Sequence, residues 1–275
     1  MVKLLFSILT FLIISISAFC QTDTTRAFSY FQKGYHQQVL RNYQESLKDY
    51  DTTVFINPDY NRVYFFRALD RYYLHDFKGS IEDYTTFIKS NPNSSSAFDN
   101  RGYSNYLLGN NEDALKDYNR AIELNPKVVK AYLNRGGVNN RLNRFNEALS
   151  DFNHALILNS NNPDIYFNIG MTKNVLNDYK GAIDAFSIVL KLQANNDKAL
   201  LYRATAKVLL KDYKGALDDL NHCLIINPNN SEAYLNRGAI KLEQYDKQSA
   251  CADFQKALAL GNTNAADVIK ENCSN

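Results

Sequence analysis

The feature that most constrains the fold is a repeat of 34 residues. Pro58, Pro92, Pro126 and Pro228 are separated by 34, 34 and 102 residues, and each follows an asparagine. A fixed period in this range indicates an array of similar supersecondary units, each stacked on its neighbours. Seven blocks follow one another without an insertion or deletion: 27–60, 61–94, 95–128, 129–162, 163–196, 197–230 and 231–264.

The same kinds of side chain recur at fixed places in these blocks. One column is very small: Gly34, Ala68, Gly102, Gly136, Gly170, Ala204 and Gly238. A second small column follows twelve residues later, at Ser46, Ser80, Ala114, Ala148, Ala182, Ala216 and Ala250. Large side chains stand four residues before the first column and four after the second. Spacings of three and four predict helical faces, and small residues let two antiparallel helices approach closely. Each block is therefore predicted to be helix, short turn, helix.

The ends of the helices are also marked in the sequence. The residue before a proline is displaced from the helical region, so each Asn-Pro step is predicted to end the second helix of its block. The step from Asn162 to Pro163 is predicted to begin a helix instead, with Asn162 as its N-terminal cap and Pro163 in its first turn.

These columns and the 34-residue period resemble those of the tetratricopeptide repeat (TPR) family, across residues 27–264. The alternative, a coiled coil, needs a seven-residue repeat without regular turns. The resemblance implies an all-α fold: a right-handed α-solenoid superhelix of about seven helix-turn-helix units plus a C-terminal capping helix. It further implies that the first helices line a concave groove, which in this family binds an extended or helical peptide.

The two ends of the chain differ from the repeats. Residues 1–20 have a lysine before an apolar run that is too short to span a bilayer, which predicts a secretory signal peptide. Alternatives are an uncleaved anchor or a lipoprotein acylated at Cys20, although Phe19 is bulky for a lipoprotein signal. Residues 21–26 form a short segment after the signal. Residues 265–275 are predicted to be a capping helix and tail.

Two charged columns change together from block to block. The basic column is Lys33, Arg67, Arg101, Arg135, Arg203 and Arg237, and the acidic column sixteen residues later is Asp49, Asp83, Asp117, Asp151, Asp219 and Asp253. In the fifth block both are apolar, Ile169 and Ala185. Loss of both signs together favours a structural ion pair between the helices of a block. The alternative is a charged ladder that binds a ligand.

Aromatic residues concentrate on the first helices of the first three blocks. Asparagines recur at one column from the third block onward, and in this family such a column can hydrogen-bond the backbone of a bound peptide. The aromatic residues, these asparagines and Arg62 form the predicted ligand groove: Phe31, Tyr35, Arg62, Phe65, Phe66, Tyr72, Tyr73, Asn100, Tyr103, Tyr106, Asn134 and Asn168. An exposed aromatic patch often marks an interaction site. The alternative is that the rings pack on one another. Lysines that clamp a C-terminal carboxylate in cytosolic cochaperones are replaced by Phe31, Phe65, Asp99 and Leu133.

No catalytic, metal or cofactor site is predicted. The four histidines have no partner at metal-ligand spacing, and no nucleophile or phosphate-binding motif occurs. A formal charge of +2 gives no broad basic surface for nucleic acid. Cys223 takes a small-residue position and is predicted to be a packed thiol. An exported chain meets oxidising conditions, and a Cys251–Cys273 disulfide is predicted to join the cap to the last repeat.

The sequence thus predicts a non-enzymatic scaffold, exported to the periplasm or secreted, that binds a protein or peptide in its groove. The alternative is an envelope module whose aromatic rings stack on cell-wall glycan, or which binds a peptide stem. Membrane contact is expected only through the signal or a lipid at Cys20. The sequence does not identify the partner or the oligomeric state.

Overall fold

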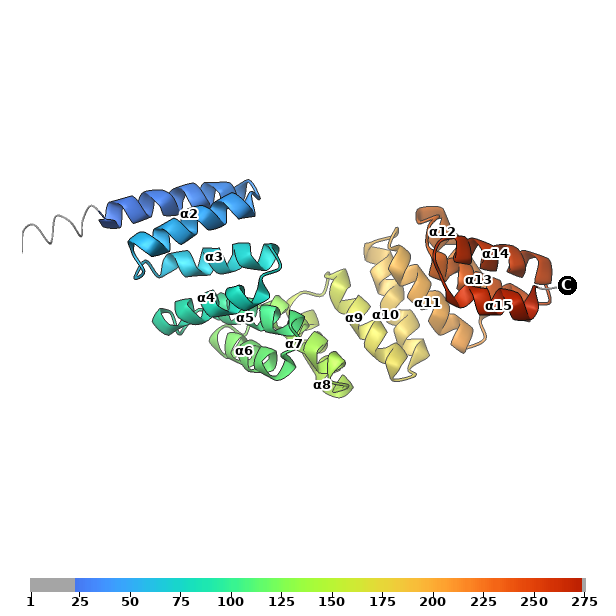
Figure 1. The fold of residues 1–275 in the computed structure, drawn as a ribbon. Helices are drawn as coiled ribbons and strands as arrows, with labels where there is room; N and C mark the ends of the chain where they lie inside the picture. The colour runs from blue at the N-terminus through green and yellow to red at the C-terminus, as the bar shows by residue number, and fades with distance from the viewer. Residues whose placement is uncertain (1–22, 274–275) are drawn as a thin grey trace, which may run out of the picture. The chain divides into compact units, whose positions relative to one another are not determined.

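The structure, a computed structural model, describes residues 23–273, and the predicted signal peptide lies outside them. This part of the chain consists of helices joined by short turns (Figure 1). It divides within α7 into two compact units, whose described parts are residues 23–138 and 139–273. Unit 1 contains the helix over 23–39, α2 (Tyr43–Ile56), α3 (Arg62–Tyr73), α4 (Phe77–Ser90), α5 (Ser95–Leu107), α6 (Asn111–Leu124) and most of α7 (Val129–Arg141).

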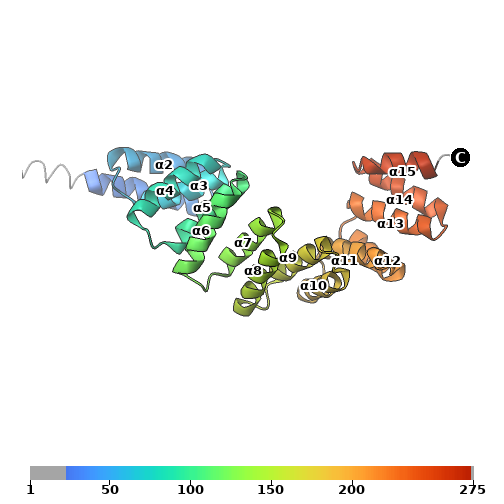
Figure 2. The same cartoon turned by 90° about the horizontal axis from the view of Figure 1, so that it is seen from below.

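Unit 2 is built in the same way and ends in an additional helix. It contains α8 (Phe145–Leu158), α9 (Pro163–Val175), α10 (Tyr179–Leu192), α11 (Asp197–Leu209), α12 (Tyr213–Ile226), α13 (Ser231–Glu243), α14 (Lys247–Ala259) and α15 (Asn264–Asn272). Consecutive helices pack on one another from α2 to α6 in unit 1 and from α8 to α14 in unit 2, and α15 lies against α14 (Figures 1 and 2). No helix among residues 23–273 is long and apolar enough to cross a membrane.

Helix ends follow the local chemistry that the sequence predicted. The second helices end at the asparagines before proline, for example α4 at Asn91 and α12 at Asn227. Asn162 caps α9 with its side chain, and Pro163 begins the helix. Aspartates cap several second helices, as where Asp178 accepts a hydrogen bond from the amide of Gly181.

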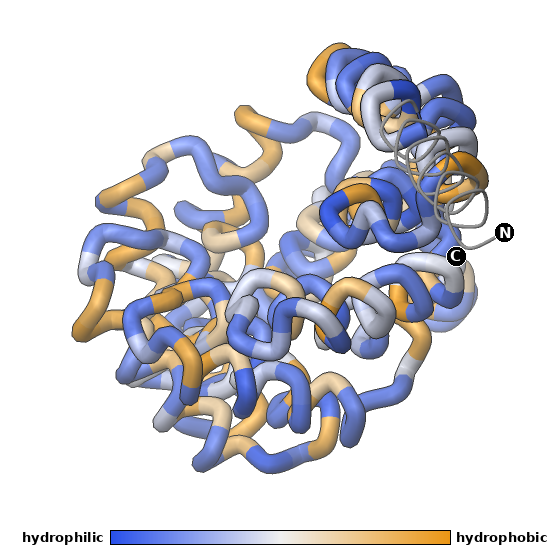
Figure 3. Tube along the Cα trace, turned by 90° about the vertical axis from the view of Figure 1, so that its left-hand side faces the viewer, coloured by the Kyte–Doolittle hydropathy of each residue, from blue (hydrophilic) through white to orange (hydrophobic). Residues whose placement is uncertain are grey.

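Apolar and polar residues are interspersed along each helix (Figure 3). The buried residues recur every three or four positions, so that one side of each helix is buried. The small columns allow the two helices of a pair to meet. A Cβ on Gly170 would lie 2.8 Å from the Phe186 ring, and one on Gly238 would lie 2.6 Å from the Phe254 ring. The rings of these second helices are fully buried there, and the first small column therefore admits only glycine or alanine.

The outermost pair at each end is closed differently. Ser29 and His36 are exposed, whereas the equivalent residues of later pairs, such as Ala97 and Ser104, are buried under the preceding pair. The first pair thus presents polar side chains outward. At the other end α15 covers the last pair, Ala265 is fully buried, and a disulfide joins Cys251 to Cys273 with their Cα atoms 5.7 Å apart. Cys223 is a buried free thiol.

The charged columns form ion pairs between the helices of a pair. Arg67, Arg101, Arg203 and Arg237 each donate through Nε and Nη2 to both oxygens of the aspartate sixteen residues on, Asp83, Asp117, Asp219 and Asp253, at 2.6 and 2.9 Å. The aspartates are at most 5% exposed. Burial raises the pKa of Asp83, although Arg67 opposes the shift.

Two other members of the columns behave differently. Lys33 is exposed and lies over the Tyr30 ring. Its charge opposes the burial that raises the pKa of Asp49, but the described residues contain no contact ion pair between the two, so the predicted first pair is corrected. Lysine has a mobile point charge rather than the planar fork that fixes the arginines. Arg135 donates to Asn119 and Asp151 accepts from Asn139. They belong to different units, and their mutual pairing stays a prediction.

The sequence did not reveal two further contacts of this network. The remaining nitrogen of each arginine reaches the second helix of the preceding pair, as from Arg101 Nη1 to Thr85 at 3.1 Å and from Arg203 Nη1 to Ser187 at 3.0 Å. Each aspartate also has a second partner one turn after its arginine. This partner is a cation for Asp83, Asp219 and Asp253, and an amide for Asp117, which accepts from Asn105 at 3.3 Å.

Candidate ligand groove

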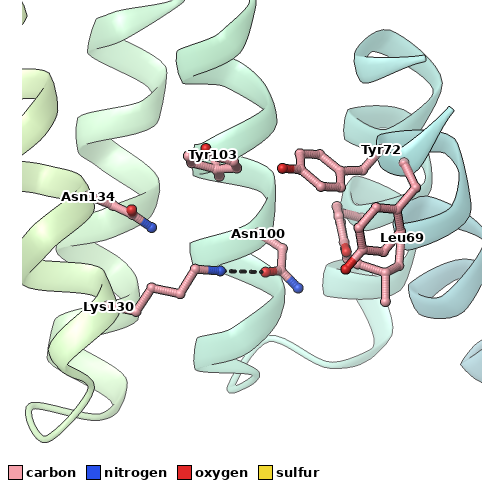
Figure 4. A pocket seen from close by; sticks show the side chains of 8 residues that line it. Leu69, Tyr72, Asn100, Tyr103, Lys130 and Asn134 are labelled. Atoms are coloured by element: carbon pink, nitrogen blue, oxygen red, sulfur yellow. Dashed lines mark hydrogen bonds between the residues drawn. The ribbon is translucent and has the colours of Figure 1, made fainter. Parts of the chain in front are cut away.

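The first helices of unit 1 form a hollow of about 330 Å³. Leu69, Tyr72 and Tyr73 of α3 make one wall, Asn100 and Tyr103 of α5 the middle, and Lys130 and Asn134 of α7 the other wall (Figure 4). The side chains meet in one hollow because equivalent positions of consecutive first helices face the same side. The hollow therefore lies on the face that the sequence predicted as the ligand groove.

Tyrosine rings make the hollow's aromatic wall. Tyr72 contacts Tyr73 at 5.2 Å in an edge-to-face arrangement and Tyr103 at 5.7 Å, and Tyr103 stacks on Tyr106 at 6.1 Å. Tyr73 also stacks on Tyr43 at 4.5 Å, yet 47% of its surface is exposed. Burial and the neighbouring Tyr103 raise the pKa of Tyr72, and this phenol therefore stays neutral. The rings hold one another in place and leave edges available to a ligand.

A buried carboxylate fixes the polar wall. Asp99 is 4% exposed, lies 3.1 Å from Lys130 Nζ, and accepts a 3.0 Å hydrogen bond from Asn134. Lys130 also lies 3.5 Å from Asn100 Oδ1 and over the Tyr103 ring. Asp99 thus orients both Lys130 and Asn134. Its column otherwise holds phenylalanine and leucine, so a lone acid there is the sequence signal that could have found it.

The second helix α4 contributes one polar atom to the floor. Tyr84 is 1% exposed and lines the hollow, and its buried hydroxyl has no hydrogen-bond partner among residues 23–273. The side chain of Asn100 lies beside this hydroxyl and partly offsets the effect of burial on its pKa. A buried polar group without a partner costs about 1–3 kcal/mol. Sequence reasoning placed Tyr84 in the core and missed its hydroxyl.

The remaining predicted groove residues of unit 1 lie closer to its N-terminal end. Phe31 is 4% exposed and packs on Tyr50, Tyr60 and Phe66, which makes it a core residue rather than a ligand contact. Phe65 is half-buried against Tyr84 and Phe87 and also belongs to the core. Phe31 and Phe65 occupy equivalent positions of their repeats, where the next helix pair covers the side chain. This coverage cannot be read from a single sequence.

A small exposed cluster remains at this end. Tyr35 is 46% exposed and meets Phe66 edge-on at 5.4 Å, and Arg62 lies over the Phe66 ring at 5.5 Å. Asn168, the last predicted groove residue, belongs to unit 2 and donates to the backbone carbonyl of Asp164. The structure thus gathers Tyr72, Tyr73, Asn100, Tyr103 and Asn134 in the hollow, with Tyr106 beside them.

Unit 2 has a second hollow, of about 390 Å³, which the sequence did not predict. It lies between α11, α13 and α15, and its lining is mainly apolar. Neither hollow contains a metal-binding arrangement, since no group of three or more His, Cys, Asp or Glu within 23–273 could hold an ion.

The helix pairs of this chain are similar to those of known repeat proteins. A protein-family model described as a TPR repeat matches residues 102–142. A solved tetratricopeptide repeat protein from Parabacteroides merdae has a TM-score of 0.69 at 20% identity, over 89% of this chain and 96% of that one. The chain has a TPR fold. The C-terminal part of a TPR repeat-containing protein from Cytophaga hutchinsonii gives a TM-score of 0.70 at 20% identity, over 86% and 98%.

One of the solved TPR structures is described by its binding site. YrrB, a TPR protein with an unusual peptide-binding site, has a TM-score of 0.58 at 21% identity, over 68% of this chain and 97% of its own. None of the curated proteins matches this chain. These likenesses show the TPR fold.

Proposed function

We propose that this TPR protein is a non-enzymatic scaffold that binds a peptide segment of a partner protein in the hollow of unit 1. The observation that carries the proposal is the polar floor of the hollow, where the Tyr84 hydroxyl is buried without a hydrogen-bond partner among the described residues and the side chain of Asn100 lies beside it. A peptide backbone has a carbonyl and an amide that satisfy both groups. The tyrosine walls would then take the flanking side chains.

The arrangement of the rings supports a peptide over a glycan. Sugar rings stack on a broad, open aromatic face. Tyr72 and Tyr73 instead meet at 68°, and one face of Tyr73 is covered by Tyr43. The narrow space beside Tyr72, with Lys130 opposite, fits a side chain or a turn of backbone. We further propose that the chain works outside the cytoplasm, on the signal-like sequence of residues 1–20.

The test is site-specific photocrosslinking in the native cell envelope. A crosslinker at Tyr73 is expected to capture a defined protein partner, and one at Phe55, which is 87% exposed on a second helix, is the matched control. The capture should be lost in Tyr103→Ala and weakened in Tyr84→Phe, which removes only the orphan hydroxyl. Equal capture at both positions, or capture unchanged in Tyr103→Ala, would refute the proposal.

The glycan alternative has a separate test. Retention on purified cell wall that depends on Tyr72 and Tyr73, with no protein captured at Tyr73, would replace the peptide with a sugar ligand. Detection of the intact chain in the cytoplasmic fraction would refute the proposed location.

A further inference from the structure

The hollow of unit 2 has a chemistry that the unit 1 site lacks. Its floor is formed by Ile240 and Phe254, which are 2% and 0% exposed, and its walls include Val208, Leu242 and Val268. A volume of about 390 Å³ falls in the range of about 300–1,000 Å³ that is usual for ligand pockets. It is therefore large enough to take a bulky aliphatic side chain.

Helix α15 completes this hollow. Val268 of α15 forms part of the wall, and the Cys251–Cys273 disulfide ties the end of that helix to α14. The wall is consequently held in place before any ligand arrives. A preformed pocket saves the ordering cost of binding.

The charges around the hollow are one-sided. Glu243 lines it, and Glu232 is exposed on the same face of α13, eleven residues or about three turns earlier. Neither carboxylate has an ion-pair partner in the described chain. The nearby cations are already engaged: Lys207 lies 2.7 Å from Asp219, and Lys241 lies 2.7 Å from Asp253. The rim is left with negative charge.

We infer that this hollow is a second docking site, for a partner segment that carries a bulky aliphatic side chain flanked by lysine or arginine. The aliphatic group enters between Val208, Leu242 and Val268, where it is removed from water. The basic flank meets Glu243, and Asn236 is available to a backbone group of the segment. Charge complementarity selects this partner over an acidic one. The site is independent of the proposed peptide site of unit 1.

The test uses fluorescein-labelled twelve-residue probes in anisotropy titrations with the purified chain. The probes share a central leucine and differ in flanks of lysine or glutamate, and a third has serine in place of leucine between lysines. The lysine-flanked leucine probe is expected to bind at least about tenfold tighter than either of the others, or by about 1.4 kcal/mol. Equal affinity for the three probes, or no binding at millimolar protein, would overturn the inference.

Two variants locate the binding. Glu243→Lys, at an exposed position, should reverse the preference from lysine to glutamate flanks. Ala239→Trp, also exposed, should fill the hollow and abolish binding. Glu82→Lys on α4 makes the same charge change in unit 1 and should leave the affinity unchanged.

The same titrations separate this site from that of unit 1. Tyr103→Ala should not change binding of the lysine-flanked probe, and if it abolishes that binding, the probe occupies unit 1 and the inference fails. Unaltered binding by Ala239→Trp would also overturn it. Self-association that Ala239→Trp abolishes would place a second copy in the hollow instead of the proposed partner.

Discussion

In unit 1 the first helices present tyrosines, Asn100 and Lys130 to their hollow, whereas in unit 2 the same face presents Val208, Leu242 and Glu243. Both faces rest on the same small columns, buried rings and arginine–aspartate pairs. The difference shows that the frame of the fold and its binding chemistry are carried by separate positions of the repeat. Ligand choice can therefore change without any change in packing.

The frame itself also differs between the units. Asp117 in unit 1 has one arginine and one amide, whereas Asp219 in unit 2 has an arginine and a lysine. Unit 1 contains a buried carboxyl, Asp70, without a cation, and unit 2 contains the disulfide. Each contrast has a measurable consequence.

The largest expected effect is on the ion pairs. Arg101→Ala leaves the buried Asp117 with Asn105 alone and is expected to cost about 3–4 kcal/mol of unfolding free energy. Arg203→Ala leaves Asp219 its lysine and should cost about half as much. Chemical denaturation, with hydrogen exchange of α6 and α12, would measure both losses. Equal losses would show that the second cation does not matter.

The pair can be tested further by a double-mutant cycle. Asp117→Ala is expected to destabilise more than the double change with Arg101→Ala, because the single change leaves a partly buried guanidinium without its acceptor. Additive losses would mean that Arg101 and Asp117 do not stabilise each other.

The disulfide is expected to act on unit 2 alone. It closes a separation of 22 residues, and its reduction should lower stability by about 3 kcal/mol in the chain-entropy account. Cys273→Ser should have the same effect without reductant. Thermal unfolding and exchange of α14 and α15 would follow the loss, and masses of alkylated protein with and without reductant would establish the bridge. Free thiols at both positions would contradict the prediction.

The buried carboxyl of unit 1 predicts a pH dependence. Asp70 is fully buried, Gln38 donates to its Oδ1 at 2.6 Å, and Oδ2 has no partner. Burial raises its pKa from 3.8 to about 6. The folded protein thus holds this proton longer than the unfolded chain, and stability falls as the pH rises from about 4 through 6.

Asp70→Asn should remove this fall. It is expected to stabilise the protein by about 2 kcal/mol at pH 7.5 and to have little effect at pH 3, where the carboxyl is largely neutral in both the folded and the unfolded state. Denaturation midpoints at pH 3 and 7.5 would measure this, with Asp113→Asn, an exposed carboxyl in a surface ion pair, as control. A variant less stable than the parent at pH 7.5 would show that Asp70 is held as a carboxylate.

The smallest expected effect concerns the turns within helix pairs. Each of these turns has one residue with a positive φ. Gly109 occupies this position in one turn, whereas His75 and Lys211 occupy it in two others, at φ of 63° and 62°. His75→Gly and Lys211→Gly should each stabilise by about 0.5–1 kcal/mol, because side chains at such φ are strained. Gly109→Ala should destabilise by about 1 kcal/mol. Thermal midpoints of the three variants would decide.

Much of the frame could be predicted from the sequence because the same kind of residue recurs at equivalent positions of every repeat. The small columns, the Asn-Pro ends and the arginine–aspartate spacing gave the helix pairs and four of the bidentate ion pairs. Lys33 shows the limit, since its charge fits the column but its side chain does not form the fork. The predicted export and block boundaries stay predictions.

The candidate site was less predictable because binding positions do not repeat. Phe31 and Tyr73 are both aromatic on first helices, yet one is covered by the next pair and the other is exposed. The Tyr84 hydroxyl enters the hollow from a ring that otherwise behaves as core. The apolar hollow of unit 2 depends on how α15 packs, which no column of the repeat describes.

The arginines that reach back to the preceding pair are expected to affect how this solenoid unfolds. Arg101 and Arg203 each hydrogen-bond to the preceding helix pair as well as to their own. When one helix pair unfolds, the arginine of the next pair loses a hydrogen-bond partner, and unfolding is therefore expected to spread cooperatively along the stack. That relay is interrupted where Ile169 replaces the arginine, and the joint between α8 and α9 has no such bridge. Melting that begins at the C-terminal end is expected to pause there, as a half-folded intermediate that persists long enough to be captured.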